Sequence, residues 1–218
     1  MFEPTLIEGP GVARARGPAA REERSRRRIG ILSFSSPGHY YPLTALGRRL
    51  QSRGHEVVYF QVADLEPAIR AAGLRFRQIG REDFLLGALR ARDEEVCKLT
   101  GLAALRCGLR GIRQKSMMLF RDAPAAIRDE GVNALIVDQI EPAGGTVAEH
   151  LGLPFVSVAA ALPVNLDASV PSVTLPWSHR VGLWPRLRNW VGNNTSELIF
   201  SGVVGTINQQ RRANLAST

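Results

Sequence analysis

The sequence predicts an α/β fold in which a Rossmann-like parallel sheet is flanked by helices. From residue 29 onward, short apolar runs rich in β-formers alternate with segments that have helical spacing. The joints between them are short, and after a long helical interruption the same alternation resumes at residues 134–159. Strands and helices that alternate in this way are typical of a doubly wound sheet.

The first block of elements covers residues 29–79. Residues 29–34 (IGILSF) suit a buried parallel strand, and residues 42–53 have the spacing of a helix that starts at a proline and ends before Gly54. A strand, a helix and a third strand are then expected at 56–61, 64–72 and 74–79.

The second block is predicted as two strands, 134–137 and 154–159, on either side of a helix at 143–151. Between the blocks, residues 82–130 carry regularly spaced leucine, isoleucine and methionine among many arginines. This pattern indicates an insertion of two or three amphipathic helices.

Residues 163–190 contain four prolines and three tryptophans, so a long loop is predicted there. Long loops with aromatic residues usually carry function. A helix is expected to follow at residues 195–215.

The N-terminal residues 1–28 are predicted to form a disordered tail, because they hold seven arginines and four glutamates without hydrophobic periodicity. The string SRRRIGIL resembles a twin-arginine export signal, but the apolar run stops too early for secretion. We therefore expect a cytoplasmic protein whose contact with a membrane is at most peripheral, since no apolar run approaches the ~18 residues of a spanning helix. The net charge of +8 indicates no specific nucleic acid.

Several kinds of site are disfavoured by the residues present. Cys97 and Cys107 lack the paired spacing of a zinc or redox site, and the four histidines do not cluster, so no metal site is expected. The loop after the first strand lacks the three spaced glycines of a dinucleotide-binding oxidoreductase. No serine lies in a Gly-x-Ser-x-Gly hydrolase motif.

His39 and Asp138 are the candidate catalytic residues. His39 follows the first strand by a few residues and precedes the expected helix start at Pro42, while Asp138 follows the strand at 134–137 directly. Both are expected at the carboxyl edge of the sheet, where ligands bind. A carboxylate beside a neutral imidazole can support general base catalysis. The alternative, in which Asp138 caps the next helix and His39 packs in a loop, stays open on spacing alone.

Three segments resemble one known family. FSSPGHYYPLTALGRRLQSRGHEVVYF resembles the opening of UDP-glycosyltransferases of the GT-B fold, and VDQIEPAGGTVAEHLGLPFVSV is similar to a later segment of these enzymes. ALPVNLDASVPSVTLPW is similar to the version in zeaxanthin glucosyltransferase-like members. The motifs occur in the family's order across about residues 29–215.

The resemblance implies an inverting transferase that moves a sugar from a UDP-sugar to a hydroxyl of a lipophilic acceptor, such as a carotenoid or another natural product. His39 matches the family's catalytic base and Asp138 its partner. The acceptor is then expected in contact with the 163–190 loop and the helical insertion. The residues predicted to bind it are Tyr40, Phe84, Met118, Leu162, Asn165 and Trp177.

One departure from the family limits these expectations. Family members have a second, donor-binding half with a His-Cys-Gly-containing motif, and no such motif occurs before the chain ends at residue 218. Residues 29–218 are therefore expected to form an acceptor-binding domain alone, inactive unless a donor domain or subunit supplies the UDP-sugar, and with no cofactor of its own. The alternative is a non-catalytic binding protein for a lipophilic hydroxylated molecule.

Overall fold

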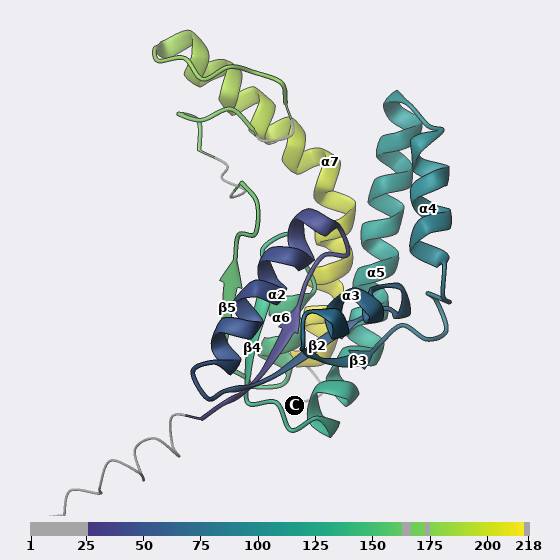
Figure 1. The fold of residues 1–218 in the computed structure, drawn as a ribbon. Coiled ribbons are helices and arrows are strands. Elements are labelled where there is room, and N and C mark those ends of the chain that lie inside the picture. The colour runs from purple at the N-terminus through teal and green to yellow at the C-terminus, as the bar shows by residue number, and fades with distance from the viewer. Residues whose placement is uncertain (1–25, 163–166, 173–174, 216–218) are drawn as a thin grey trace, which may run out of the picture.

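The computed structural model describes residues 26–162, 167–172 and 175–215 (Figure 1). These residues form a five-stranded parallel sheet with helices on both faces, which confirms the predicted fold class. The elements are β1 (Arg28–Leu32), α2 (Pro37–Gln51), β2 (Glu56–Gln61), the 3₁₀ helix η1 (Ala63–Leu65), α3 (Glu66–Ala71), β3 (Arg75–Gln78), α4 (Ala88–Cys97), α5 (Gly101–Asp129), β4 (Ala134–Asp138), α6 (Gly144–His150), β5 (Phe155–Val158) and α7 (Leu183–Leu215).

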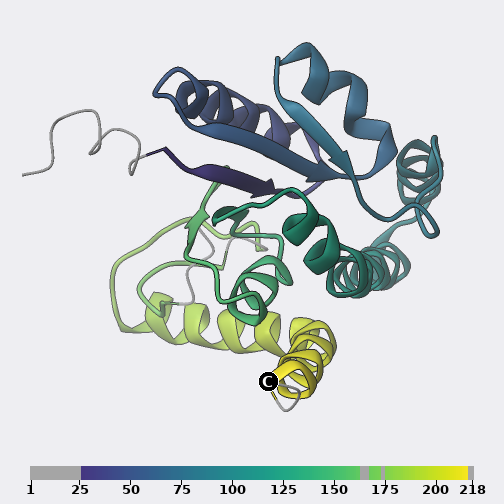
Figure 2. The same cartoon turned by 90° about the horizontal axis from the view of Figure 1, so that it is seen from below.

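The strand order is β3-β2-β1-β4-β5, so the first strand lies in the middle of the sheet. Ile31 of β1 pairs in register with Tyr59 of β2 and with Ile136 of β4. Helices α2 and α3 cover one face, and α6 packs on the other, with α7 outside it, packed against α5 and α6 (Figure 2). Because both faces are covered, the central strands are apolar almost throughout, and Ile31 and Leu32 are fully buried.

The first helix begins five residues earlier than the sequence predicts. It starts at Pro37, preceded by an extended Ser36, so that His39 lies in its first turn and not in a loop. Both Pro37 and Pro42 are compatible with the start of a helix, and the earlier proline occupies the first position, where a missing N–H costs nothing. Pro42 lies inside the helix.

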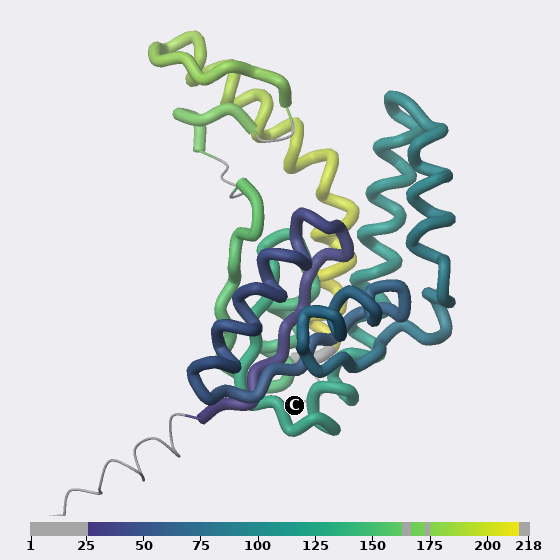
Figure 3. The backbone as a smooth tube through the Cα atoms, viewed as in Figure 1, coloured from purple at the N-terminus to yellow at the C-terminus, as the bar shows by residue number. Residues whose placement is uncertain are grey.

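The predicted insertion consists of two helices, α4 and α5, which lie side by side as a hairpin (Figures 1 and 3). The predicted loop at 163–190 is shorter than expected, because α7 begins at Leu183 and therefore includes Trp184 and Trp190. Gly182, with φ of 133°, directly precedes this helix, and Pro185 falls in its first turn, where proline is tolerated.

The N-terminal segment is described only from residue 26 onward, so residues 1–25 of the predicted tail lie outside the described residues. Arg28, which the sequence analysis assigned to the tail, is the first residue of β1, and its guanidinium lies 2.7 Å from the Glu56 carboxylate of β2. Within the described ranges, none of the helices is both long and apolar enough to cross a lipid bilayer.

Close packing between α6 and β4 positions the strand that ends at Asp138. A Cβ atom at Gly144 would lie 2.4 Å from Val137 Cγ1, whereas one at Gly145 would meet only the Phe155 ring, at 3.4 Å. We expect Gly144→Ala to lower the free energy of unfolding by about 1–3 kcal/mol through overpacking, measured by urea denaturation. The matched variant Gly145→Ala should be neutral or stabilising. Equal effects of the two substitutions would contradict this account.

Candidate functional site

His39 and Asp138 meet at the point where the strand order reverses. The chain leaves β1 toward β2 on one side and later enters β4 on the other, so the carboxyl ends of β1 and β4 are neighbours. Asp138 is the last residue of β4, and His39 lies just after β1 in the first turn of α2. His39 Nδ1 is 2.8 Å from Asp138 Oδ2. Open α/β sheets bind their ligands at such a switch point.

The Asp138 side chain is 1% exposed, and its hydrogen bonds fix its orientation. Oδ2 also accepts the backbone N–H of Phe34 at 3.3 Å, and Oδ1 accepts that of Ile140 at 3.2 Å. Helix α6 begins six residues later, at Gly144, so Asp138 does not cap it as the alternative interpretation supposed. Its side chain instead joins the loops that follow β1 and β4.

The His39 imidazole is 14% exposed and lies edge-on to the Phe34 ring, with 5.8 Å between the ring centroids. With Asp138 ionised, Nδ1 carries the proton of their hydrogen bond, and Nε2 is left unprotonated in the neutral ring. The carboxylate can also stabilise the imidazolium that forms when Nε2 takes up a proton. The arrangement is therefore suited to general base catalysis.

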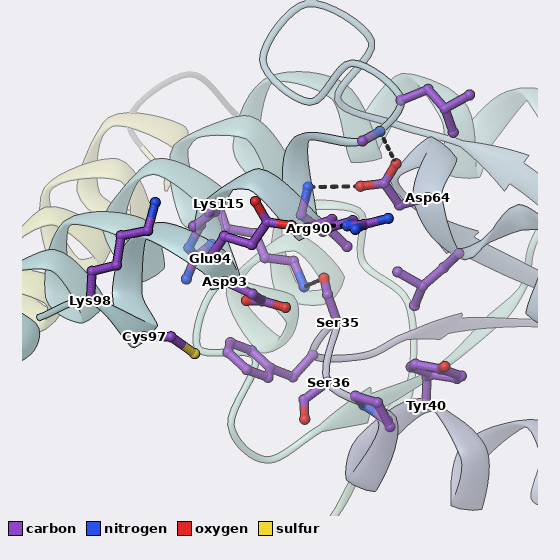
Figure 4. Close-up of a pocket in the computed structure, with 17 residues that line it drawn as sticks. Ser35, Ser36, Tyr40, Asp64, Arg90, Asp93, Glu94, Cys97, Lys98 and Lys115 are labelled. Atoms are coloured by element: carbon purple, nitrogen blue, oxygen red, sulfur yellow. Dashed lines mark hydrogen bonds and ion pairs between the residues drawn. The ribbon is translucent and has the colours of Figure 1, made fainter.

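A cavity of about 1130 Å³ is lined by residues that neighbour His39 in the chain, among them Ser36 and Tyr40 (Figure 4). Residues 34–37 and Tyr40 line one side, and the start of the α4–α5 hairpin lines the other, from Leu86 to Lys98. The Asp64 carboxylate anchors that hairpin by accepting the backbone N–H groups of Gly87 and Leu89. The cavity thus combines apolar side chains with charged ones from α4.

Of the predicted acceptor residues that the structure describes, Tyr40 alone lines the cavity. Burial, reinforced by the neighbouring Tyr41, raises the pKa of Tyr40 to about 12, so its phenol stays protonated at neutral pH and can donate a hydrogen bond. The ring centroids of Tyr40 and Tyr41 are 4.4 Å apart.

The other predicted acceptor residues lie elsewhere. Phe84 and Met118 are core residues, 4% and 1% exposed, and both lie close to Gly80. Met118 is buried because the apolar face of α5 turns toward the sheet, whereas Phe84 lies in the loop between β3 and α4. Leu162 is 78% exposed, and Trp177 stacks under the Arg188 guanidinium, 5.0 Å from its ring centroid. These four residues do not line the cavity. Asn165 falls outside the described residues.

Two buried charged residues close to the site were missed by the sequence analysis. Lys115 of α5 and Glu141, in the loop after β4, form an ion pair of 2.7 Å and are 4% and 2% exposed. Burial raises the pKa of Glu141, and the Lys115 charge opposes that shift. The available signal was a lysine on the otherwise buried face of α5, one turn from Gly111 and Met118.

Comparison with curated proteins finds relatives named as glucosyltransferases. Models of known protein families give no match. Zeaxanthin glucosyltransferase from Pantoea ananas is 36% identical over 141 residues, which cover 65% of this chain and 32% of the relative. The enzyme of the same name from Pseudescherichia vulneris is 32% identical over 143 residues, covering 65% and 33%. The chain thus spans about a third of the length of these curated relatives.

Among solved structures, the Streptomyces sp. SF2575 glycosyltransferase SsfS6, complexed with thymidine diphosphate, superimposes with a TM-score of 0.54. The match covers 85% of this chain and 44% of that chain at 19% sequence identity, so it shows the fold. The chain is therefore similar in sequence to zeaxanthin glucosyltransferases and in fold to a solved glycosyltransferase, in each case over part of the relative's length.

Proposed function

We propose that this chain is the acceptor-binding part of an inverting, UDP-sugar-dependent glycosyltransferase that acts on a hydroxyl group of a lipophilic, carotenoid-like molecule. The observation that carries the proposal is the 2.8 Å contact between His39 and Asp138 at the switch point of the sheet, where chain neighbours of His39 line a large cavity. The two relatives named as zeaxanthin glucosyltransferases support the choice of acceptor class.

The cavity suits a long, mostly apolar molecule with a hydroxyl group. Its volume of about 1130 Å³ exceeds the ~300–1,000 Å³ of common small-molecule sites. Leu86, Leu89 and Phe34 offer apolar surface to the body of the acceptor. The Tyr40 phenol and the Ser36 hydroxyl, on the wall next to His39, can hydrogen-bond its hydroxyl end.

In the proposed reaction, His39 Nε2 takes the proton of the acceptor hydroxyl as its oxygen bonds to the anomeric carbon of the donor sugar. The bond from that carbon to the UDP oxygen breaks, and UDP leaves with the electron pair. Attack from the face opposite UDP inverts the anomeric configuration. The imidazolium formed on His39 is stabilised by the Asp138 carboxylate, 2.8 Å away.

Binding of the UDP-sugar is assigned to a different part of the enzyme. The relatives are about three times as long as the matched region, and their further length can supply a donor site, on one chain or on a separate subunit. Residues 29–218 are proposed as the acceptor domain. The chain is expected to bind acceptor by itself and to transfer sugar only together with the donor-binding part.

Acceptor binding can be tested with zeaxanthin, whose absorbance shift reports complex formation. Leu86→Asp introduces a charge on the cavity wall at a position that is 79% exposed, so it should weaken binding about tenfold without unfolding the protein. Leu102→Asp, on α5 at 60% exposure and away from the cavity lining, is the matched control and should bind normally.

Two outcomes would count against the proposal. No saturable zeaxanthin binding by the unmodified chain would refute an acceptor site for this class of molecule. Tight binding that never leads to transfer of glucose from UDP-glucose, with any donor-binding part, would favour the alternative of a non-catalytic binding protein.

A further inference from the structure

Lys115 is a buried cation that the proposed reaction does not use. Its Nζ donates to the Ser33 backbone carbonyl and to Ser35 Oγ, each at 2.9 Å, and lies 2.7 Å from Glu141 Oε2. Ser33 and Ser35 lie directly after β1, whereas Glu141 lies directly after β4. One side chain from α5 therefore joins the two loops that lead from the central strands.

The geometry of these contacts argues against a role of Lys115 in binding a ligand. Two of the three N–H donors of the ammonium group are used in hydrogen bonds within the protein, and its charge is matched by Glu141 at 2.7 Å. The Ser33 carbonyl accepts a second hydrogen bond from Gln61 Nε2 at 2.8 Å, which uses both of its lone pairs. Although Lys115 borders the cavity (Figure 4), its charge is thus directed into the protein.

The joined loops carry the proposed catalytic pair. Ser35 is four residues before His39, and the Glu141 backbone N–H donates to the Asp138 carbonyl at 2.9 Å. Phe34 completes the connection: its backbone N–H donates to Asp138 Oδ2, and its ring lies 5.1 Å from Lys115 Nζ. A displacement of either loop would therefore change the distance between the imidazole and the carboxylate.

Stability alone does not explain this buried pair. Desolvation of two charges largely offsets their attraction, and apolar residues of similar volume often fold as well or better. The electrostatic pair differs from an apolar one in that it fixes a single relative arrangement of the three segments it joins.

We propose that Lys115, paired with Glu141, is a positioning residue that holds the loops after β1 and β4 so that His39 stays hydrogen-bonded to Asp138. This inference rests on the proposed function, since positioning of the pair affects transfer only if His39 is the base.

The test uses the double variant Lys115→Met/Glu141→Leu, which replaces the ion pair by apolar residues. We expect its melting temperature to stay close to that of the unmodified chain, while the downfield Nδ1–H proton resonance of His39 in NMR spectra is lost. An unchanged resonance in the folded double variant would overturn the proposal. If the double variant does not fold, the test uses Ser35→Ala, which removes one hydrogen-bond partner of Lys115. This variant should weaken the same His39 resonance. An unchanged resonance would overturn the proposal as well.

The matched control is Glu66→Gln/Arg70→Met, which removes an exposed ion pair on α3 and should change neither measurement. The NMR result does not depend on sugar transfer. Failure of the unmodified chain to bind zeaxanthin would contradict the proposed function alone, whereas an unaltered His39 signal would contradict the positioning role alone.

Discussion

His39→Ala is expected to lower the rate of sugar transfer about 10²–10⁴-fold, the usual contribution of a positioned general base. The reason is that the acceptor hydroxyl then has no group to receive its proton, while Asp138 lies too deep to replace it at 1% exposure. Initial rates are measured with UDP-glucose and zeaxanthin, with the donor-binding part present. Zeaxanthin affinity should change much less than the rate, because the apolar wall formed by Phe34, Leu86 and Leu89, which is proposed to hold the body of the acceptor, stays intact.

The matched control for this prediction is His55→Ala. His55 Nδ1 accepts the Arg27 backbone N–H at 3.2 Å, just before β2 and therefore at the opposite end of the sheet from His39. This variant should transfer sugar at the unmodified rate. If His39→Ala retained that rate as well, the assignment of the base would be wrong.

The second large effect is expected from Lys115→Met, which should lower the free energy of unfolding by about 3–5 kcal/mol, because it leaves a buried carboxylate without its counter-ion. The loss of unfolding free energy in Lys115→Met should be greater at pH 8 than at pH 5. Burial already raises the pKa of Glu141 in the folded protein, and removal of the opposing Lys115 charge raises it further.

The direction of this pH dependence follows from proton binding. Above the ordinary glutamate pKa of about 4.3, the unfolded chain has released the proton, while the folded variant still holds it on Glu141. Stability therefore falls as pH rises, until the raised pKa of the folded state is passed. Urea denaturation at both pH values measures the effect. Lys98→Met, an exposed lysine that also borders the cavity, is the control, and an equal loss at both pH values for Lys115→Met would contradict the role given to Glu141.

The centre of the sheet was predictable because β1, β2 and β4 contain short apolar runs that helices on both faces bury. The positions of His39 and Asp138 at one edge follow from the same pattern, since each comes just after such a run. The predicted start of α2, at Pro42, was wrong because Pro37 and Pro42 both fit the first turn of a helix. Pro185, two residues after the start of α7 at Leu183, was the sequence feature from which that start could have been predicted.

The lining of the cavity could not be predicted from local sequence. Met118 and Phe84 have the chemistry of acceptor-binding residues, but whether the helix face of Met118 and the loop side chain of Phe84 meet the core depends on packing between distant segments. The same limit applies to Lys115, whose partners lie 82 and 80 residues earlier in the chain, at Ser33 and Ser35. A buried lysine is recognisable as paired only when the fold has brought its partners together.

In the proposed function, the α4–α5 hairpin separates the recognition of an acceptor from the chemistry performed on it. The sheet edge supplies the imidazole and the carboxylate, whereas one wall of the cavity comes from an insertion between β3 and β4. Helix α4 has no fully buried residue, and only its first two, Ala88 and Leu89, pack against the core, so most of its side chains can be exchanged without repacking the core. Substitutions on α4 can therefore alter one wall of the cavity and leave the imidazole and the carboxylate in place, so the hairpin is where directed evolution toward new hydroxylated substrates should begin.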